Sequence, residues 1–262
     1  MQLSASQITQ YERDGFLFFP GLLDSDEVAL LQGAMPSILS RSGNEIIREK
    51  EDPTSVRLAF GAHSYSEPFR RLSLLPRIVE PMKQLLGEDV YLHQSRMNPK
   101  QGFGSGQSWA WHQDYSAWNV VDGMPEPRCV MVAVFIDDCT TAKSPLLVIP
   151  GSHRDGFLDD VELHQDADGY SLYQLDQETF VRLADEYGIE PLVGPAGSVC
   201  FCHSIVVHGS ANNVSPWRRA IMYLIYNAVS NACTNGDRPW FQNNRDFTPL
   251  TAIDDEDLRR LT

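Results

Sequence analysis

The stretch RCVMVAVFIDD, residues 128–138, decides the fold class of this chain. It is a short apolar run rich in β-branched residues that ends in two aspartates, which is typical of a strand buried on both faces. Three further runs have the same character: PLLVIPG (145–151), GSVCFCHSIVVHG (197–209) and RRAIMYLIYNAVS (218–230). Because glycine and proline separate these runs, we expect strands joined by turns.

Helical periodicity dominates the first third of the chain. Residues 22–43 predict a helix, and Asp24 followed three residues later by Glu27 resembles a capping box at its start. Residues 66–89 form a second helical region, and one more helix is expected at 176–187. Helices followed by a run of strands differ from the alternation of a parallel doubly wound fold. The pattern predicts a mainly β fold with flanking helices and a double-stranded β-helix (jelly-roll, cupin-like) core.

The length of 262 residues suits one domain of this class, so we expect a single domain over residues 1–262. It divides into a helical N-terminal part at about 1–88 and a jelly-roll core at about 89–230. Within the core, residues 155–190 hold 11 acidic residues and one basic residue, so this insertion carries −10 of the formal net charge of −14. We expect it to be either a solvated surface segment or a lid over the site.

Composition excludes several classes of partner. A net charge of −14 disfavours nucleic acid, which attracts basic surfaces. No apolar run reaches the roughly 18 residues of a transmembrane helix, and the N-terminal sequence has no signal-peptide pattern. Five cysteines, an odd number in a chain without an export signal, indicate reduced thiols and a cytoplasmic protein. We therefore expect a small-molecule substrate, no nucleic-acid or membrane partner, and a monomer or homodimer.

The aromatic run WHQDYSAW, residues 111–118, contains the most informative polar pair. His112 and Asp114 would point to the same face of a strand, where they are either an ordinary hydrogen-bonded pair or two metal ligands. His208 ends a later apolar strand and is a candidate third ligand, while strand alternation places His203 on the opposite face. Two histidines and one carboxylate are the ligands of non-haem Fe(II) oxygenases, and they leave three coordination positions open.

Open positions of this kind accept a 2-oxo acid cosubstrate, which needs a cation for its far carboxylate. Arg219 lies 11 residues after His208, at the start of the next predicted strand. A guanidinium binds a carboxylate through two parallel hydrogen bonds, and Ser210 could add a hydroxyl donor. The alternative is an arginine at the rim of the fold, paired with surface carboxylates.

The chain resembles the phytanoyl-CoA dioxygenase (PhyH) superfamily, and within it the branch of ectoine hydroxylase and of free amino-acid hydroxylases such as leucine hydroxylase. The resemblance covers nearly the whole chain. It is carried by segments 8–28, 90–98, 108–138, 145–153 and 194–227, and residues 238–250 are closer to the amino-acid hydroxylases. One departure is AKSPLLVIPGSH, where relatives usually have an asparagine-glycine-proline turn before the strand. This departure concerns the shape of the turn and of the nearby pocket.

The resemblance implies a jelly-roll enzyme that uses Fe(II), 2-oxoglutarate and O₂. It implies that His112, Asp114 and His208 bind iron and that Arg219, assisted by Ser210, binds the distal carboxylate of 2-oxoglutarate. The positions that match the lining of the 2-oxoglutarate pocket are Gln94, Asn98 and Trp111, although plain core packing explains Trp111 equally well.

The implied reaction is hydroxylation of an unactivated C–H bond in a small free amino acid or derivative, with decarboxylation of 2-oxoglutarate to succinate and CO₂. The carboxylate of Asp114 argues against a halogenase, because halogenases of this superfamily have glycine or alanine there. Alternatives are an ectoine 5-hydroxylase or a tailoring hydroxylase of another small metabolite. A non-catalytic jelly-roll binding or sensing protein is an alternative of another class, and the intact ligand set argues against it.

Five residues are candidates for substrate binding. Arg57, or Arg245 together with Asp246, could bind the charged groups of a zwitterion. Tyr115 and Trp118, just beyond the metal-ligand pair, could wall an aliphatic side chain. Structural salt bridges and core aromatic packing are the alternatives for all five.

Overall fold

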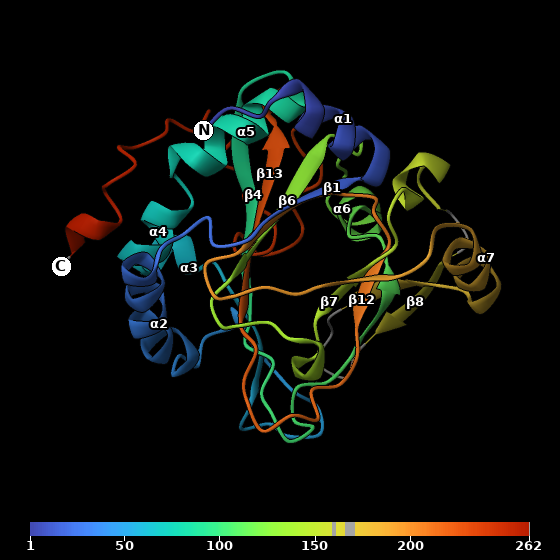
Figure 1. The fold of residues 1–262 in the computed structure, drawn as a ribbon, viewed down its shortest axis with the longest axis horizontal. Helices are drawn as coiled ribbons and strands as arrows, with labels where there is room; N and C mark the ends of the chain where they lie inside the picture. Colours follow the sequence, from blue (N-terminus) through green and yellow to red (C-terminus); the bar gives the residue numbers. More distant parts are fainter. Residues whose placement is uncertain (159–160, 166–170, 262) are drawn as a thin grey trace.

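Two antiparallel sheets form the centre of the computed structural model, which describes residues 1–158, 161–165 and 171–261 (Figure 1). The larger sheet has the order β1-β11-β6-β13-β4-β3-β2. Its strands are, in that order, Phe16–Phe19, Val199–His203, Cys129–Phe135, Ile221–Ala228, Val90–Asn98, Val56–Phe60 and Ile46–Arg48. The smaller sheet, β10-β7-β12-β5-β9-β8, has strands Glu190–Leu192, Leu146–Val148, His208–Ser210, Trp109–His112, Ser171–Leu175 and Val161–Gln165. Two such sheets confirm the mainly β class predicted from the sequence.

Helices α2 (Ser25–Leu39), α3 (Ala62–Tyr65) and α4 (Glu67–Leu72) lie on the side of the larger sheet away from β7 and β12, and α5 (Pro76–Leu86) and α1 (Ala5–Asp14) lie at the upper end of the sheet in the view of Figure 1. The expected capping box is present, since the Asp24 carboxylate accepts the Glu27 backbone N–H and the Glu27 side chain accepts the Asp24 N–H. This reciprocal pair satisfies backbone donors that a helix start leaves without partners.

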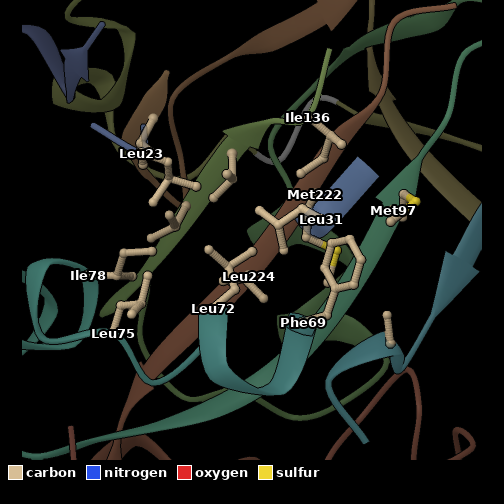
Figure 2. Packing of buried hydrophobic residues seen from close by; sticks show 14 of the residues in the cluster. Leu23, Leu31, Phe69, Leu72, Leu75, Ile78, Met97, Ile136, Met222 and Leu224 are labelled. Carbon is tan, nitrogen blue, oxygen red and sulfur yellow. The ribbon is translucent and has the colours of Figure 1, made fainter. Parts of the chain in front are cut away.

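Alternate side chains of β13 face opposite layers. Leu224 lies in one buried cluster with Phe69 and Leu72 of α4 (Figure 2). Its neighbour Ile225 lies in a second buried cluster that includes Val148 of β7 in the smaller sheet. The two-residue period of a strand therefore gives the larger sheet one helix-covered face and one face toward the smaller sheet.

The N-terminal part is less purely helical than predicted. The apolar run Phe16–Phe19 is strand β1, and it pairs with β11 so that Phe16 lies opposite Cys202. Strand β3 pairs with β4, with Phe60 opposite Arg96. Runs of four or five apolar residues do not distinguish a strand from a helix by periodicity, so only the pairing with distant strands reveals them.

The acidic insertion is joined to the smaller sheet. Its strands β8 and β9 pair with each other, and β9 pairs with β5 where Gln174 lies opposite His112. Helix α7 (Gln177–Tyr187) follows. Residues 159–160 and 166–170 of this insertion lie outside the described residues, and its predicted role as a lid stays a prediction. Among the described residues, no helix is long and apolar enough to cross a membrane.

Candidate metal centre

His112, Asp114 and His208 converge between the two sheets. One nitrogen or oxygen atom from each lies within 4.8 Å of the others, and all three residues are buried. The His112 Nε2 atom is 3.5 Å from Asp114 Oδ1, and the His208 Nε2 atom is 3.7 Å from Asp114 Oδ2. The three donors therefore surround one point, as a metal ion bound by two imidazoles and a carboxylate requires.

His112 and Asp114 do not lie on the same strand, so strand alternation does not explain why their side chains meet. Strand β5 ends at His112, and Asp114 has helical torsion angles, φ −60° and ψ −34°, at the start of helix α6 (Tyr115–Val120). His208 comes from the neighbouring strand β12, where it lies opposite His112. The pair predicted to share one face of a strand thus meets at the junction of a strand and a helix.

Backbone carbonyl groups orient both imidazole rings. The Nδ1 atom of His112 lies 2.6 Å from the Ala110 carbonyl oxygen, and that of His208 lies 2.9 Å from the Val206 carbonyl oxygen. A carbonyl accepts only from a protonated nitrogen, so Nδ1 carries the hydrogen and Nε2 presents its lone pair to the centre. Burial, followed by the nearby His112, lowers the pKa of His208 to about 4. The ring is neutral at pH 7 and ready to bind a metal.

Arg96 balances the charge of Asp114. Burial by itself would raise the pKa of Asp114, but the Arg96 guanidinium and the two histidines outweigh it and keep this pKa well below its ordinary value. Arg96 Nη2 donates to Asp114 Oδ2, and Arg96 Nη1 donates to Gln94 Oε1 at 3.0 Å. The carboxylate is consequently ionised and available to a cation.

A small cavity opens onto the three ligands. Both sheets contribute to its walls. The lining residues are Leu58, Arg96, Asn98, Trp109, His112, Asp114, Leu146, His208, Gly209, Ser210 and Tyr223.

Two buried cations lie directly behind polar residues of this lining. Arg219 is completely buried, and its Nη1 atom donates to Asn98 Oδ1 at 3.2 Å. Lys100 is also completely buried, and its Nζ atom donates to Ser210 Oγ at 2.7 Å. Burial lowers the pKa of Lys100 well below its ordinary value, and the nearby charge of Arg219 adds to this effect. The structure thus places Asn98, Ser210 and Arg219, which the sequence analysis named together, near the three metal-ligand candidates, and their binding roles stay predictions.

Sequence reasoning missed Arg96 and Lys100 as functional residues. A signal for both was present, because residues 94, 96, 98 and 100 share one face if the alternation of β4 continues past its end. Two cations on the face that holds Asn98 would have indicated binding of anionic groups.

Trp111 does not line the cavity, in contrast to the expectation from the resemblance. Its ring stacks on Phe180 of α7, with 4.8 Å between ring centroids. Trp109 lines the cavity instead. Trp111 directly precedes His112, so strand alternation places its side chain on the opposite face. A register shift brings Trp109 to the face of His112, since β12 pairs His208 with His112 but Ser210 with Trp109, and the extra residue in β5 is a bulge.

Gln94 also stands outside the lining of the cavity. Its Oε1 atom accepts from Arg96, and its Nε2 atom donates to the Gln242 carbonyl oxygen at 2.6 Å. Gln94 therefore holds Arg96 in place rather than contacting the cavity directly.

The aromatic residues after Asp114 belong to the core. Tyr115 is buried, and its hydroxyl donates to backbone carbonyl oxygens of Met124 and Pro125. Trp118 is 1% exposed and packs edge-on against His93. Neither residue lines the cavity, so the core-packing alternative holds for both.

The three charged candidates for substrate binding lie apart from the cavity lining. Arg57 is buried, forms a 3.0 Å ion pair with Glu49 and lies over the Trp109 ring at 3.8 Å. It supports a wall of the cavity through Trp109. Arg245 and Asp246 are exposed and make contacts to nearby backbone, so the structure gives them no place in the cavity.

Comparison with known proteins agrees with this geometry. The family model of phytanoyl-CoA dioxygenase (PhyH) matches residues 11–221. The chain belongs to the PhyH family. It is 35% identical to L-proline trans-4-hydroxylase of Streptomyces griseoviridis, over 95% of this chain and 96% of that protein. It is 38% identical to ectoine dioxygenase of Bordetella parapertussis, over 87% of this chain and 77% of that protein.

A PhyH-family structure supports the same assignment. The crystal structure of EctD from S. alaskensis with 2-oxoglutarate and 5-hydroxyectoine has a TM-score of 0.84 and 33% sequence identity, covering 96% of this chain and 88% of that one. EctD from the same source has also been solved with bound Fe. Together with the buried histidine and carboxylate cluster, these relatives confirm that the chain is an Fe(II)/2-oxoglutarate-dependent dioxygenase with a jelly-roll fold.

Proposed function

We propose that this PhyH-family enzyme hydroxylates a small free amino acid or a close derivative, with L-proline as the first candidate substrate. The observation that carries the proposal is the convergence of His112, Asp114 and His208 on a small cavity with cations on two sides. L-proline is favoured because the match to the proline hydroxylase extends over almost the full length of both chains. Ectoine, another small cyclic amino acid, is the second candidate.

His112, Asp114 and His208 would hold Fe(II) through two Nε2 atoms and a carboxylate oxygen. The bound Fe(II) and 2-oxoglutarate supply the oxidising chemistry, in which O₂ is consumed and 2-oxoglutarate becomes succinate and CO₂. Arg219 would hold the distal carboxylate of 2-oxoglutarate, supported by Ser210, Asn98 and Lys100 at the same end of the cavity. Placing opposite charge there fixes the orientation of the cosubstrate before reaction.

Arg96 is the lining cation beside the metal ligands, and we assign it to the carboxylate of the amino acid substrate. It is 7% exposed, and its guanidinium lies 5.4 Å from the ring centroid of Tyr223. Low exposure strengthens an ion pair with a bound carboxylate, because little water competes for the charge. Arg96 therefore replaces Arg57, Arg245 and Asp246 as the proposed substrate contact.

Unpaired, buried thiols support a cytoplasmic setting. All five cysteines are free and buried, as expected in a reducing compartment. The proposed partners are a small-molecule substrate and 2-oxoglutarate. The protein itself is proposed to be a monomer or homodimer.

The decisive experiment incubates the Fe(II)-loaded protein with 2-oxoglutarate, O₂ and one candidate substrate at a time. The panel contains the standard amino acids, their common homologues and ectoine. Succinate release and a product heavier by one oxygen atom are expected with L-proline, and both are expected to vanish in His112→Ala. Turnover of ectoine alone would select the second candidate. Turnover of no compound would favour a non-catalytic binding protein or a tailoring enzyme for another metabolite.

A further inference from the structure

Ser144 has a backbone conformation that serine rarely adopts. It follows the short 3₁₀ turn η1 (Thr141–Lys143) and precedes β7, with φ 54° and ψ 66°. Among the described residues, Phe103 is the only other non-glycine residue with a positive φ. Glycine adopts this left-handed region without cost, whereas serine loses stability there. A serine at this position therefore indicates contacts that compensate.

Those contacts reach both buried cations. The Ser144 carbonyl oxygen accepts hydrogen bonds from Arg219 Nε at 3.0 Å and from Arg219 Nη2 at 2.8 Å. The Ser144 hydroxyl accepts from Lys100 Nζ at 3.2 Å and donates to the Ala211 carbonyl oxygen at 2.5 Å. A single residue thus ties the guanidinium through its backbone and the ammonium through its side chain.

Among the described residues, neither cation forms an ion pair with a carboxylate. Glu49, whose charge favours the Lys100 ammonium, is itself paired with Arg57 at 3.0 Å. Like charges that are buried close together repel each other, so this arrangement needs an anion to balance it. Each cation donates a hydrogen bond to a residue that lines the cavity: Lys100 to Ser210, and Arg219 to Asn98. The anion that belongs here is one that enters through the cavity.

We propose that Ser144 is a positioning residue for 2-oxoglutarate, which sets the spacing between Lys100 and Arg219 behind Ser210 and Asn98 of the cavity lining. This inference rests on the proposed function. Because the hydroxyl holds Lys100 and the carbonyl holds Arg219, the two charges are fixed relative to the metal ligands. A fixed spacing selects the length of the oxo acid, so Ser144 favours 2-oxoglutarate over 2-oxoadipate, which is one methylene longer.

The test compares the wild-type enzyme with Ser144→Gly. Glycine keeps the positive φ and the carbonyl contact to Arg219. It removes the hydroxyl, and with it one of the three hydrogen bonds that Lys100 Nζ donates, while those to Ser210 Oγ and to the Ala211 carbonyl oxygen, both 2.7 Å, remain. In the absence of O₂, the Fe(II)-loaded proteins are titrated with 2-oxoglutarate or with 2-oxoadipate. Binding is followed by the visible charge-transfer band of the complex between Fe(II) and the oxo acid. We expect Ser144→Gly to weaken 2-oxoglutarate binding about 5- to 20-fold, the effect of losing one hydrogen bond. We also expect a smaller preference for 2-oxoglutarate over 2-oxoadipate.

The matched control is Phe103→Gly, which places glycine at the other positive φ. Phe103 is 82% exposed and touches neither cation, so its variant should bind both oxo acids as the wild type does. Unchanged affinity and selectivity in Ser144→Gly would overturn the role of Ser144. An equal loss for both oxo acids together with a lower melting temperature would also overturn it, since that result describes a general structural defect. Absence of the band in the wild type would instead contradict the proposed function.

Discussion

His112 on β5 and His208 on β12 are directly opposed in the smaller sheet, with their ring centroids 4.3 Å apart. The two residues are 96 positions apart in the chain, and strand pairing alone brings them together. Asp114, just beyond the end of β5, completes the cluster. The metal centre of this PhyH-family protein therefore depends on the register between two short strands.

Replacing either opposed histidine should abolish tight metal binding. We expect His112→Ala and His208→Ala each to weaken Fe(II) binding by more than about 100-fold, because even the loss of outer contacts to a metal ligand costs about 10- to 100-fold. Calorimetric titration of the metal-free proteins measures this. His203→Asn is the control, since His203 lies on β11 and contacts Tyr11 and His153 away from the centre. Metal binding that survives in His112→Ala would refute the ligand assignment.

Arg96→Met should separate substrate binding from cosubstrate binding. We expect KM for the amino acid to rise about 10- to 100-fold, as for a lost hydrogen bond to a charged group, while 2-oxoglutarate affinity changes much less. Steady-state kinetics with each compound varied in turn gives both values. Arg128→Met serves as the control, because Arg128 pairs with Glu88 at the partly exposed surface. An equal rise in both constants would contradict the assignment of Arg96 to the substrate.

Gln113 lies between the metal-ligand candidates His112 and Asp114, and its side chain joins this segment to residues 156–158 and to Ile205. Its Nε2 atom donates to the carbonyl oxygens of Gly156 and Ile205, and its Oε1 atom accepts from the Leu158 N–H. Gln113→Leu should lower the free energy of unfolding by about 1–3 kcal/mol, because it leaves these buried groups without partners. It should also weaken Fe(II) binding about tenfold, because mutation of residues that hold metal ligands in place lowers metal affinity by about 10- to 100-fold.

Denaturant unfolding and metal titration of the same samples check both effects of Gln113→Leu. Gln113→Glu is the matched variant, since it keeps the shape and the acceptor but removes the two donated hydrogen bonds. A stability loss without any change in metal affinity would show that Gln113 serves the fold alone.

The free energy of unfolding should decrease as the pH falls from about 6.5 to 4, a range in which histidines titrate and most carboxylates stay ionised. Burial lowers the pKa of His63 to about 4, and burial together with His153 lowers the pKa of His203 to about 4. An unfolded histidine titrates near pH 6.5, so between about pH 6.5 and 4 the unfolded chain binds more protons than the folded one. Each such histidine reduces the free energy of unfolding by up to about 1.4 kcal/mol per pH unit as the pH falls.

Urea unfolding of the metal-free protein at several pH values between 7 and 4.5 measures this dependence. His63→Gln removes one of the titrating groups, so its stability should depend less steeply on pH than that of the wild type. Identical slopes for the two proteins would show that His63 does not resist protonation in the folded state.

Much of the fold and of the metal site follows from local sequence features. Runs such as 128–138 and 218–230 are apolar, rich in β-branched residues and bounded by turn residues, and this combination favours strands buried on both faces. The His112 and Asp114 pair and the late His208 are recognisable because few other combinations leave coordination positions open for an oxo acid. Ser210 and Arg219 were predicted from their position after His208 and from the resemblance to the family, whereas Asn98 was predicted from the resemblance alone.

Tertiary structure alone decided which neighbouring side chains reach the cavity. The bulge in β5 places Trp109 in the cavity, and a shift of one residue of this kind is invisible in the sequence of one strand. The exposure of Arg245 and the burial of Lys100 likewise depend on which distant segments cover them. The sequence by itself determined the chemical groups and the strands that carry them. Register and burial, set by pairing between segments far apart in the chain, determined which of those groups meet.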